Sequence, residues 1–113
     1  KENKDRVDFH IKQRKDKMNK LPYTLTDEEW QDTLKEFNYS CAYCGEKTEL
    51  EKEHFIPVSK DGGYTVDNML PACLKCNRSK YNNDFFEWYP DYEFYDEERE
   101  IHILNYLGYQ EIN

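Results

Sequence analysis

The chain has 113 residues, of which 37% are hydrophobic and 35% charged, and its formal net charge is −8. This length fits one domain with a thin core, and an aromatic content of 16% argues against a chain that is disordered throughout, because aromatic side chains bury large areas. No apolar run approaches the roughly 18 residues of a membrane helix, so we expect a soluble intracellular protein with no membrane partner.

The charge is distributed unevenly along the chain. Residues 1–20 hold eight Lys and Arg against four Asp and Glu, residues 21–80 hold seven against eleven, and residues 81–113 hold one against nine. The acidic total argues against a nucleic-acid partner, but such asymmetry is typical of a protein that binds a polyanion through one arm or face. We therefore describe a single domain, 1–113, with a basic arm (1–20), a central part (21–80) and an acidic, aromatic, helical tail (81–113).

The N-terminal half predicts two helices. A weak apolar line along residues 4–19 predicts a basic helix. Residues 26–29 read Thr-Asp-Glu-Glu, a capping box that begins a second helix over 27–38. Its buried face is given by three apolar residues at helical spacing: Trp30, Leu34 and Phe37.

The segment from residue 50 to 81 predicts strands and a helix. A strand is expected over 50–56, and a turn follows at 60–63, where paired glycines tolerate positive φ. Residues 66–71 read as a loop or a short second strand. A helix is expected over 73–81.

The acidic tail is expected to add aromatic side chains to the core and to form the last helix. The aromatic cluster over 85–89 fits the core better than a base-stacking surface. A helix is expected over 96–107, with Gly108 as its C-cap. Its inward-facing residues are predicted to be Ile101, Leu104 and Leu107.

Four cysteines form two C-x2-C pairs, Cys41 with Cys44 and Cys73 with Cys76. In a cytosolic chain such pairs predict a structural zinc site, because four thiolates complete a tetrahedron around one Zn²⁺. The alternative is two disulfides in a secreted domain. The 28 residues between the pairs leave room for a functional segment.

The segment between the cysteine pairs carries the remaining motif. Residues 53–63 read EHFIPVSKDGG, and two asparagines, Asn68 and Asn77, lie 14 and 23 residues after His54. Framed by the two C-x2-C pairs, this pattern resembles the HNH endonuclease family over residues 40–80. The resemblance implies an α+β fold with a small zinc-stabilised ββα-metal core (His-Me finger) flanked by helices. It also implies the cytoplasm of a bacterium or phage-infected host.

Phosphodiester hydrolysis needs an activated water and a cation at the phosphate. The resemblance implies that His54 is the general base and that Asn68 pins the loop that orients it. It also implies that Asn77 and Glu53 hold a catalytic Mg²⁺ or Mn²⁺, whose hardness suits oxygen ligands. Glu53 stands where Asp is commoner in the family, and strand geometry places it opposite His54 unless the strand bends. The structural alternatives are a solvated Glu53 and an Asn77 that supports the second cysteine pair.

We expect DNA as the partner, bound through phosphate contacts, because clustered cations supply sequence-independent affinity. A solvated helix face is the alternative role of the arm. The expected cations are Lys12, Arg14, Lys15, Lys17, Lys20, Arg78 and Lys80. RNA remains open as a substrate. The alternative function is a non-catalytic zinc module that binds DNA or protein.

Overall fold

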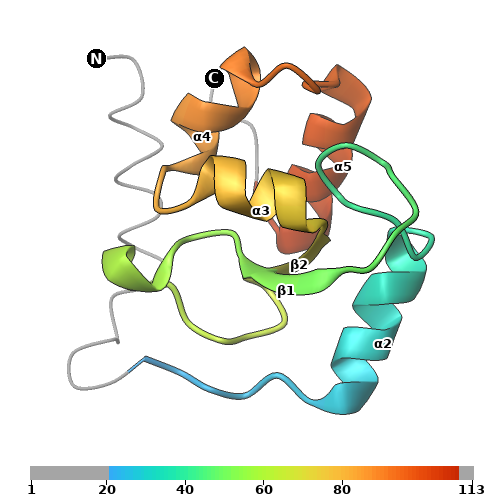
Figure 1. Cartoon of the computed structure of the whole chain (residues 1–113). Coiled ribbons are helices and arrows are strands. Elements are labelled where there is room, and N and C mark those ends of the chain that lie inside the picture. Colours follow the sequence, from blue (N-terminus) through green and yellow to red (C-terminus); the bar gives the residue numbers. More distant parts are fainter. Residues whose placement is uncertain (1–20, 110–113) are drawn as a thin grey trace.

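A computed structural model describes residues 21–109 (Figure 1). The predicted basic helix over 4–19 therefore lies outside the described residues, as do five of the expected DNA contacts: Lys12, Arg14, Lys15, Lys17 and Lys20. The described elements are α2 (Asp27–Glu36), β1 (Glu51–His54), η1 (Val58–Lys60), β2 (Met69–Ala72), α3 (Leu74–Lys80), α4 (Phe85–Trp88), η2 (Tyr89–Asp91) and α5 (Glu97–Leu107). The fold is α+β, as predicted. Within residues 21–109 no helix is both long enough and apolar enough to cross a bilayer.

Helix α2 begins at the predicted capping box. The Thr26 hydroxyl accepts a hydrogen bond from the Glu29 N–H, and the Glu29 carboxylate accepts one from the Thr26 N–H, each at 3.0 Å. The helix ends at Glu36, two residues earlier than predicted, because residues 38 and 39 adopt positive φ. Trp30 and Phe37 are buried as expected, whereas Leu34 is only half-buried.

Two short strands form an antiparallel sheet with Glu51 opposite Ala72 and His54 opposite Met69. Strand β1 was predicted, although it is shorter than the expected 50–56, and β2 shows that the segment read as a loop or a short strand over 66–71 contains a strand. All of β2 is buried, whereas in β1 the first two residues are exposed, Glu53 is buried and His54 is half-buried. Figure 1 shows α3 lying across this sheet. This arrangement puts the polar strand β1 between the cysteine pairs and next to α3.

The turn after β1 differs in detail from the prediction. The positive φ belongs to Asp61, at 74°, and to neither glycine of the turn. Gly62 is needed for a different reason: a Cβ there would lie 1.6 Å from the Ile56 carbonyl oxygen. The glycine therefore permits a close approach of two backbone segments, which closes the loop beside His54.

The acidic tail completes the core. Phe85, Phe86 and Tyr89 are buried, which confirms the aromatic cluster as core, although the two short helices that carry it, α4 and η2, were not predicted. Helix α5 ends at Gly108, whose φ is 89°, as expected for a C-cap. The predicted inward face of α5 was partly wrong, because Ile101 is 52% exposed and Ile103 is buried in its place.

Candidate active site

The four cysteines meet at one point of the fold. Their Sγ atoms all lie within 4.8 Å of one another, and the Sγ atoms of Cys44 and Cys73 are 3.8 Å apart. Four thiolates at a Zn–S distance of about 2.3 Å would have sulfurs about 3.8 Å apart, so the cluster fits one tetrahedral zinc ion. All four cysteines are free thiols, which excludes the disulfide alternative in this structure.

Hydrogen-bond donors surround this sulfur cluster. The Tyr92 hydroxyl donates to Cys76 Sγ at 3.1 Å, and the Cys76 N–H lies 3.5 Å from Cys73 Sγ. Donors of this kind stabilise negative charge on sulfur and fix the orientation of metal ligands. The cluster joins the turn after α2 to the start of α3, so it holds the two halves of the central part together.

His54 is the last residue of β1, and its side chain is half-buried. Its ring lies 5.8 Å from the ring of Tyr64, measured between centroids. Burial, and secondarily the charge of Lys80, holds the pKa of His54 below its usual value of 6.5. This lowered pKa favours the neutral imidazole at pH 7, which is the form that can accept a proton.

Asn68 is buried and fastens the loop that follows His54. Its Oδ1 accepts a hydrogen bond from the Ile56 N–H at 2.8 Å, and its Nδ2 donates to the carbonyl of Gly63 at 2.9 Å and to that of Ile56 at 3.2 Å. Its own carbonyl accepts from the Phe55 N–H at 2.7 Å. The side chain and backbone of Asn68 thus hold both the end of β1 and the far side of the turn.

Lys80 was expected to contact DNA, and its position in the structure contradicts this expectation. Its side chain is completely buried, and its ammonium donates to Glu53 Oε2 at 3.1 Å and to the carbonyls of His54 and Phe55 at 3.1 and 2.8 Å. An ammonium in this position has no access to a phosphate. Lys80 instead fixes the backbone at the end of β1.

Glu53 was expected to be a metal ligand, and its burial contradicts this expectation too. Its side chain is 4% exposed, and its two oxygens accept hydrogen bonds from Lys80 and from the Tyr43 hydroxyl. Burial raises the pKa of Glu53, and the adjacent Lys80 opposes that rise. Strand alternation turns Glu53 toward α3 and the core, so it does not present an open oxygen to a cation.

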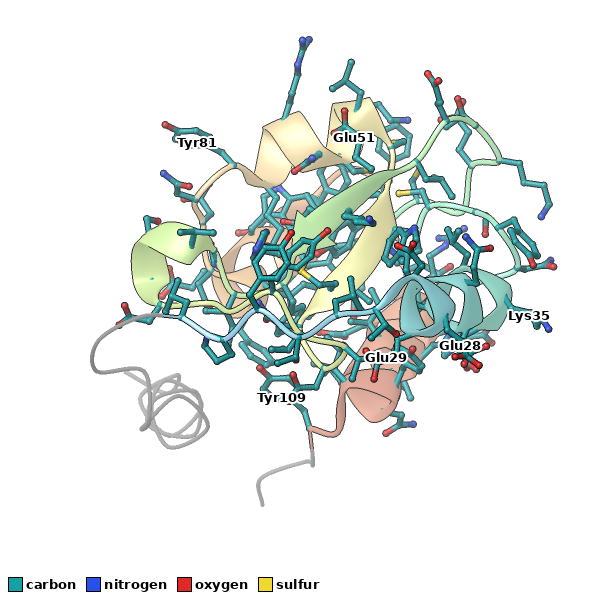
Figure 2. The ribbon with its side chains drawn as sticks, turned by 90° about the horizontal axis from the view of Figure 1, so that it is seen from below. Glu28, Glu29, Lys35, Glu51, Tyr81 and Tyr109 are labelled. Atoms are coloured by element: carbon teal, nitrogen blue, oxygen red, sulfur yellow. The ribbon has the colours of Figure 1, made fainter. Side chains whose placement is uncertain are left out.

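Asn77 lies one helical turn before Lys80 and is half-buried. Its Nδ2 donates to Glu51 Oε1 at 2.7 Å, across the gap between α3 and β1. Figure 2 shows the labelled Glu51 against α3. Over residues 21–109, the amide oxygen of Asn77 accepts no hydrogen bond. Asn77 therefore offers the open oxygen donor that a hard cation requires, which fits the expected Mg²⁺ or Mn²⁺.

Two residues of β1 were missed by sequence reasoning. Glu51 is the partner of Asn77, and Lys52 is exposed with its Nζ 5.9 Å from the centre of the Tyr64 ring. The only available indication was the geometry of a strand, whose period of two places Glu51 with Glu53 on one face and Lys52 with His54 on the other. Arg78 is exposed on α3, as a phosphate contact requires.

The family-model comparison matches residues 41–83 to a family described as HNH endonuclease. Residues 41–83 belong to the HNH endonuclease family. This HNH segment runs from the first cysteine to just beyond α3, and it contains His54, Asn68 and Asn77.

Two relatives are similar to the chain. The first is the "SPbeta prophage-derived putative HNH endonuclease YoqL" of Bacillus subtilis, which is 36% identical in an 81-residue alignment that covers 59% of this chain and 34% of the relative. The second is the CRISPR-associated endonuclease Cas9 of Corynebacterium diphtheriae, 36% identical over 55 residues, covering 45% of this chain and 5% of that protein. The chain thus spans about a third of the length of the first relative and a small part of the second.

Proposed function

We propose that the chain is a metal-dependent HNH endonuclease that hydrolyses DNA phosphodiester bonds. The observation that carries the proposal is a half-buried His54 at the end of β1, inside the segment that matches the HNH family, with burial holding its pKa below the usual value. A histidine held neutral at pH 7 is suited to take a proton from water, and the names of both relatives describe endonucleases.

In this proposal, His54 is the general base and its environment keeps it in place. Lys80 bonds to the His54 carbonyl, and Asn68 ties together the loop that follows, so the chain is restrained at His54 and just after it. Tyr64 lies against one side of the ring. Restraint of this kind lowers the entropy lost in aligning the base with its water, because the ring is already oriented before substrate binds.

A divalent cation, Mg²⁺ or Mn²⁺, would be held through the open oxygen of Asn77. When bound, such a cation neutralises charge that develops on the phosphate and on the leaving oxygen. The four cysteines would hold zinc as a structural ion, away from the chemistry, because a four-thiolate site leaves no open coordination position.

DNA contacts are assigned to cations that can reach a phosphate. Arg78 is exposed on α3, the helix that also carries Asn77. We assign the remaining contacts to the basic arm: Lys12, Arg14, Lys15, Lys17 and Lys20. Together they would supply affinity that is independent of DNA sequence and sensitive to salt.

The test is conversion of supercoiled plasmid by the zinc-loaded protein, with Mg²⁺ and with EDTA. We expect relaxed or linear product with Mg²⁺ alone. Absence of product on plasmid and on single-stranded DNA would overturn the proposal in favour of a non-catalytic zinc module. Cleavage of RNA but not DNA would overturn the substrate assignment.

A further inference from the structure

A stacked pair of tyrosines lies beside His54. The rings of Tyr23 and Tyr64 have their centroids 4.4 Å apart at an interplanar angle of 29°, and Tyr23 is 76% exposed. Tyr64 also contacts the His54 ring, with 5.8 Å between centroids. An exposed aromatic ring is therefore only two ring contacts away from the candidate general base.

Backbone hydrogen bonds hold this pair in place. The Tyr64 N–H donates to the Pro22 carbonyl at 2.9 Å, and the Tyr64 carbonyl accepts from the N–H groups of Thr24 and Leu25 at 3.0 and 3.1 Å. Figure 1 shows this segment before α2, in blue, passing below the loop that joins η1 to β2. Because the backbone under Tyr23 is already fixed, a ligand that stacks on its ring orders little additional chain.

A cation lies on the same face of β1. Lys52 is exposed, two residues before His54, and its Nζ lies 5.7 Å from the centre of the Trp30 ring and 5.9 Å from that of the Tyr64 ring. Within residues 21–109 no carboxylate forms an ion pair with this ammonium. Tyr64 is therefore the common neighbour of His54, Tyr23 and a positive charge that an anion can reach.

These groups match the parts of a nucleic-acid strand. An aromatic face binds a nucleobase by stacking, with little regard to sequence, and an ammonium binds a phosphate. Inside a paired duplex both faces of each base are covered by its neighbours, so only an unpaired or unstacked base offers a face to Tyr23. An apolar protein surface would also cover this ring, but the adjacent cation and His54 favour a nucleic-acid strand.

We propose that Tyr23, backed by Tyr64, is a stacking platform for an unpaired nucleobase next to the phosphate on which His54 acts, and that Lys52 contacts the backbone of the same strand. The inference rests on the proposed function for the chemistry at His54, whereas base stacking on Tyr23 is measured without cleavage. It predicts that the preferred substrate is single-stranded DNA, or DNA that is unpaired at the cleavage position.

The binding test uses the full chain, loaded with zinc and without added Mg²⁺, and two short labelled strands with the same number of phosphates. One strand is made of thymidines, and in the other every base is replaced by an abasic residue. Fluorescence anisotropy gives the affinities of wild type, Tyr23→Ala, Tyr23→Phe and Tyr39→Ala. Tyr39→Ala is the matched control, because Tyr39 is 50% exposed and lies after α2, next to the first cysteine pair. Circular dichroism and zinc content confirm that each variant is folded.

Wild type, Tyr23→Phe and Tyr39→Ala are expected to bind the thymidine strand more tightly than the abasic strand. Tyr23→Ala should lose at least about 5-fold in affinity for the thymidine strand, because one base no longer stacks, and should bind the abasic strand as wild type does. An equal loss on both strands would overturn the proposal, since it would mean that Tyr23 does not contact a base. So would an unchanged affinity of Tyr23→Ala for the thymidine strand, or a wild type that does not prefer it.

Lys52 is tested on the same two strands. Lys52→Gln should weaken the binding of both alike and reduce the slope of log affinity against log salt by about 0.7, the value for one phosphate contact with a single strand. Lys35→Gln is the control, because Lys35 is an exposed lysine near the end of α2. A slope that Lys52→Gln leaves unchanged would remove Lys52 from the strand site.

Cleavage separates this inference from the proposed function. A labelled strand is treated with wild type or Tyr23→Ala and Mg²⁺, either alone or annealed to its complement. Faster cleavage of the single strand, lost in Tyr23→Ala, supports the inference. Base-dependent binding through Tyr23 without any cleavage would support the platform and remove the nuclease. Equal cleavage of both substrates by both proteins would leave the nuclease standing and overturn the platform.

Discussion

The ammonium of Lys80 lies 3.1 Å from a carboxylate oxygen of Glu53, and both side chains are buried. The pair sits between α3 and β1, and Lys80 also bonds to the carbonyl groups of two residues at the strand end. A buried charge pair is costly to break, because removing one partner leaves the other charge uncompensated. The contact thus fixes α3 against the strand that carries His54.

Lys80→Met should destabilise the protein by about 3–5 kcal/mol, because it leaves the Glu53 carboxylate in the core without a compensating charge. Urea unfolding measures the change, with Arg78→Met as the control on the exposed side of the same helix. Adding Glu53→Gln to Lys80→Met should recover part of the loss. A Lys80→Met protein as stable as the control would show that the pair does not support the fold.

Removing the zinc site should unfold the chain. Structural zinc of this kind contributes on the order of 10 kcal/mol of apparent folding free energy, so Cys73→Ser should lose both zinc and the cooperative thermal transition. Elemental analysis and circular dichroism give the two readouts. A chelator should have the same effect on wild type, reversed by added zinc. A wild type without zinc, or a fully stable Cys73→Ser, would contradict the assignment.

The basic arm should contribute affinity for DNA through phosphate contacts. Changing Lys12, Arg14 and Lys15 to Glu should weaken binding and reduce the slope of log affinity against log salt by about one unit for each lost contact. Binding to a short duplex is measured by fluorescence anisotropy at several salt concentrations. An unchanged slope would favour the alternative of a solvated helix face.

Cleavage should depend on pH through His54. The base must be neutral to act, and burial lowers its pKa, so cleavage should rise with pH through an apparent pKa below 6.5 and then level off. Protonation below that pKa switches the base off. Single-turnover rates between pH 5 and 8 at saturating Mg²⁺ measure this profile. An apparent pKa well above 6.5 would show that another group controls the rate.

Local patterns in the sequence predicted much of the fold. The capping box at Thr26 and the glycine at 108 act within one helical turn, and the structure has both helix ends where these residues place them. The two C-x2-C pairs predicted the sulfur cluster, since each pair brings two thiols together within one turn. Helix α4 was missed because four residues are too few to show a helical period.

The polar strand β1 could not be interpreted from sequence in the same way. Residues 51–54 read Glu-Lys-Glu-His, so no alternation of apolar and polar residues shows which face is buried. The burial of Glu53 depends on Lys80, 27 residues later, and the hydrogen bond of Glu51 depends on Asn77, 26 residues later. These contacts form only when α3 packs against the strand, and no local pattern encodes that packing.

The most direct test of the central claim is the single-turnover cleavage rate of His54→Ala at pH 7.5 with saturating Mg²⁺. The variant should retain zinc, Mn²⁺ binding and DNA binding, and its rate should fall by about 100-fold or more, because only the proton acceptor is lost. Asn77→Ala should behave differently, with a loss that raised Mg²⁺ partly restores. A His54→Ala protein that cleaves at the wild-type rate would contradict the assignment of His54 as the base.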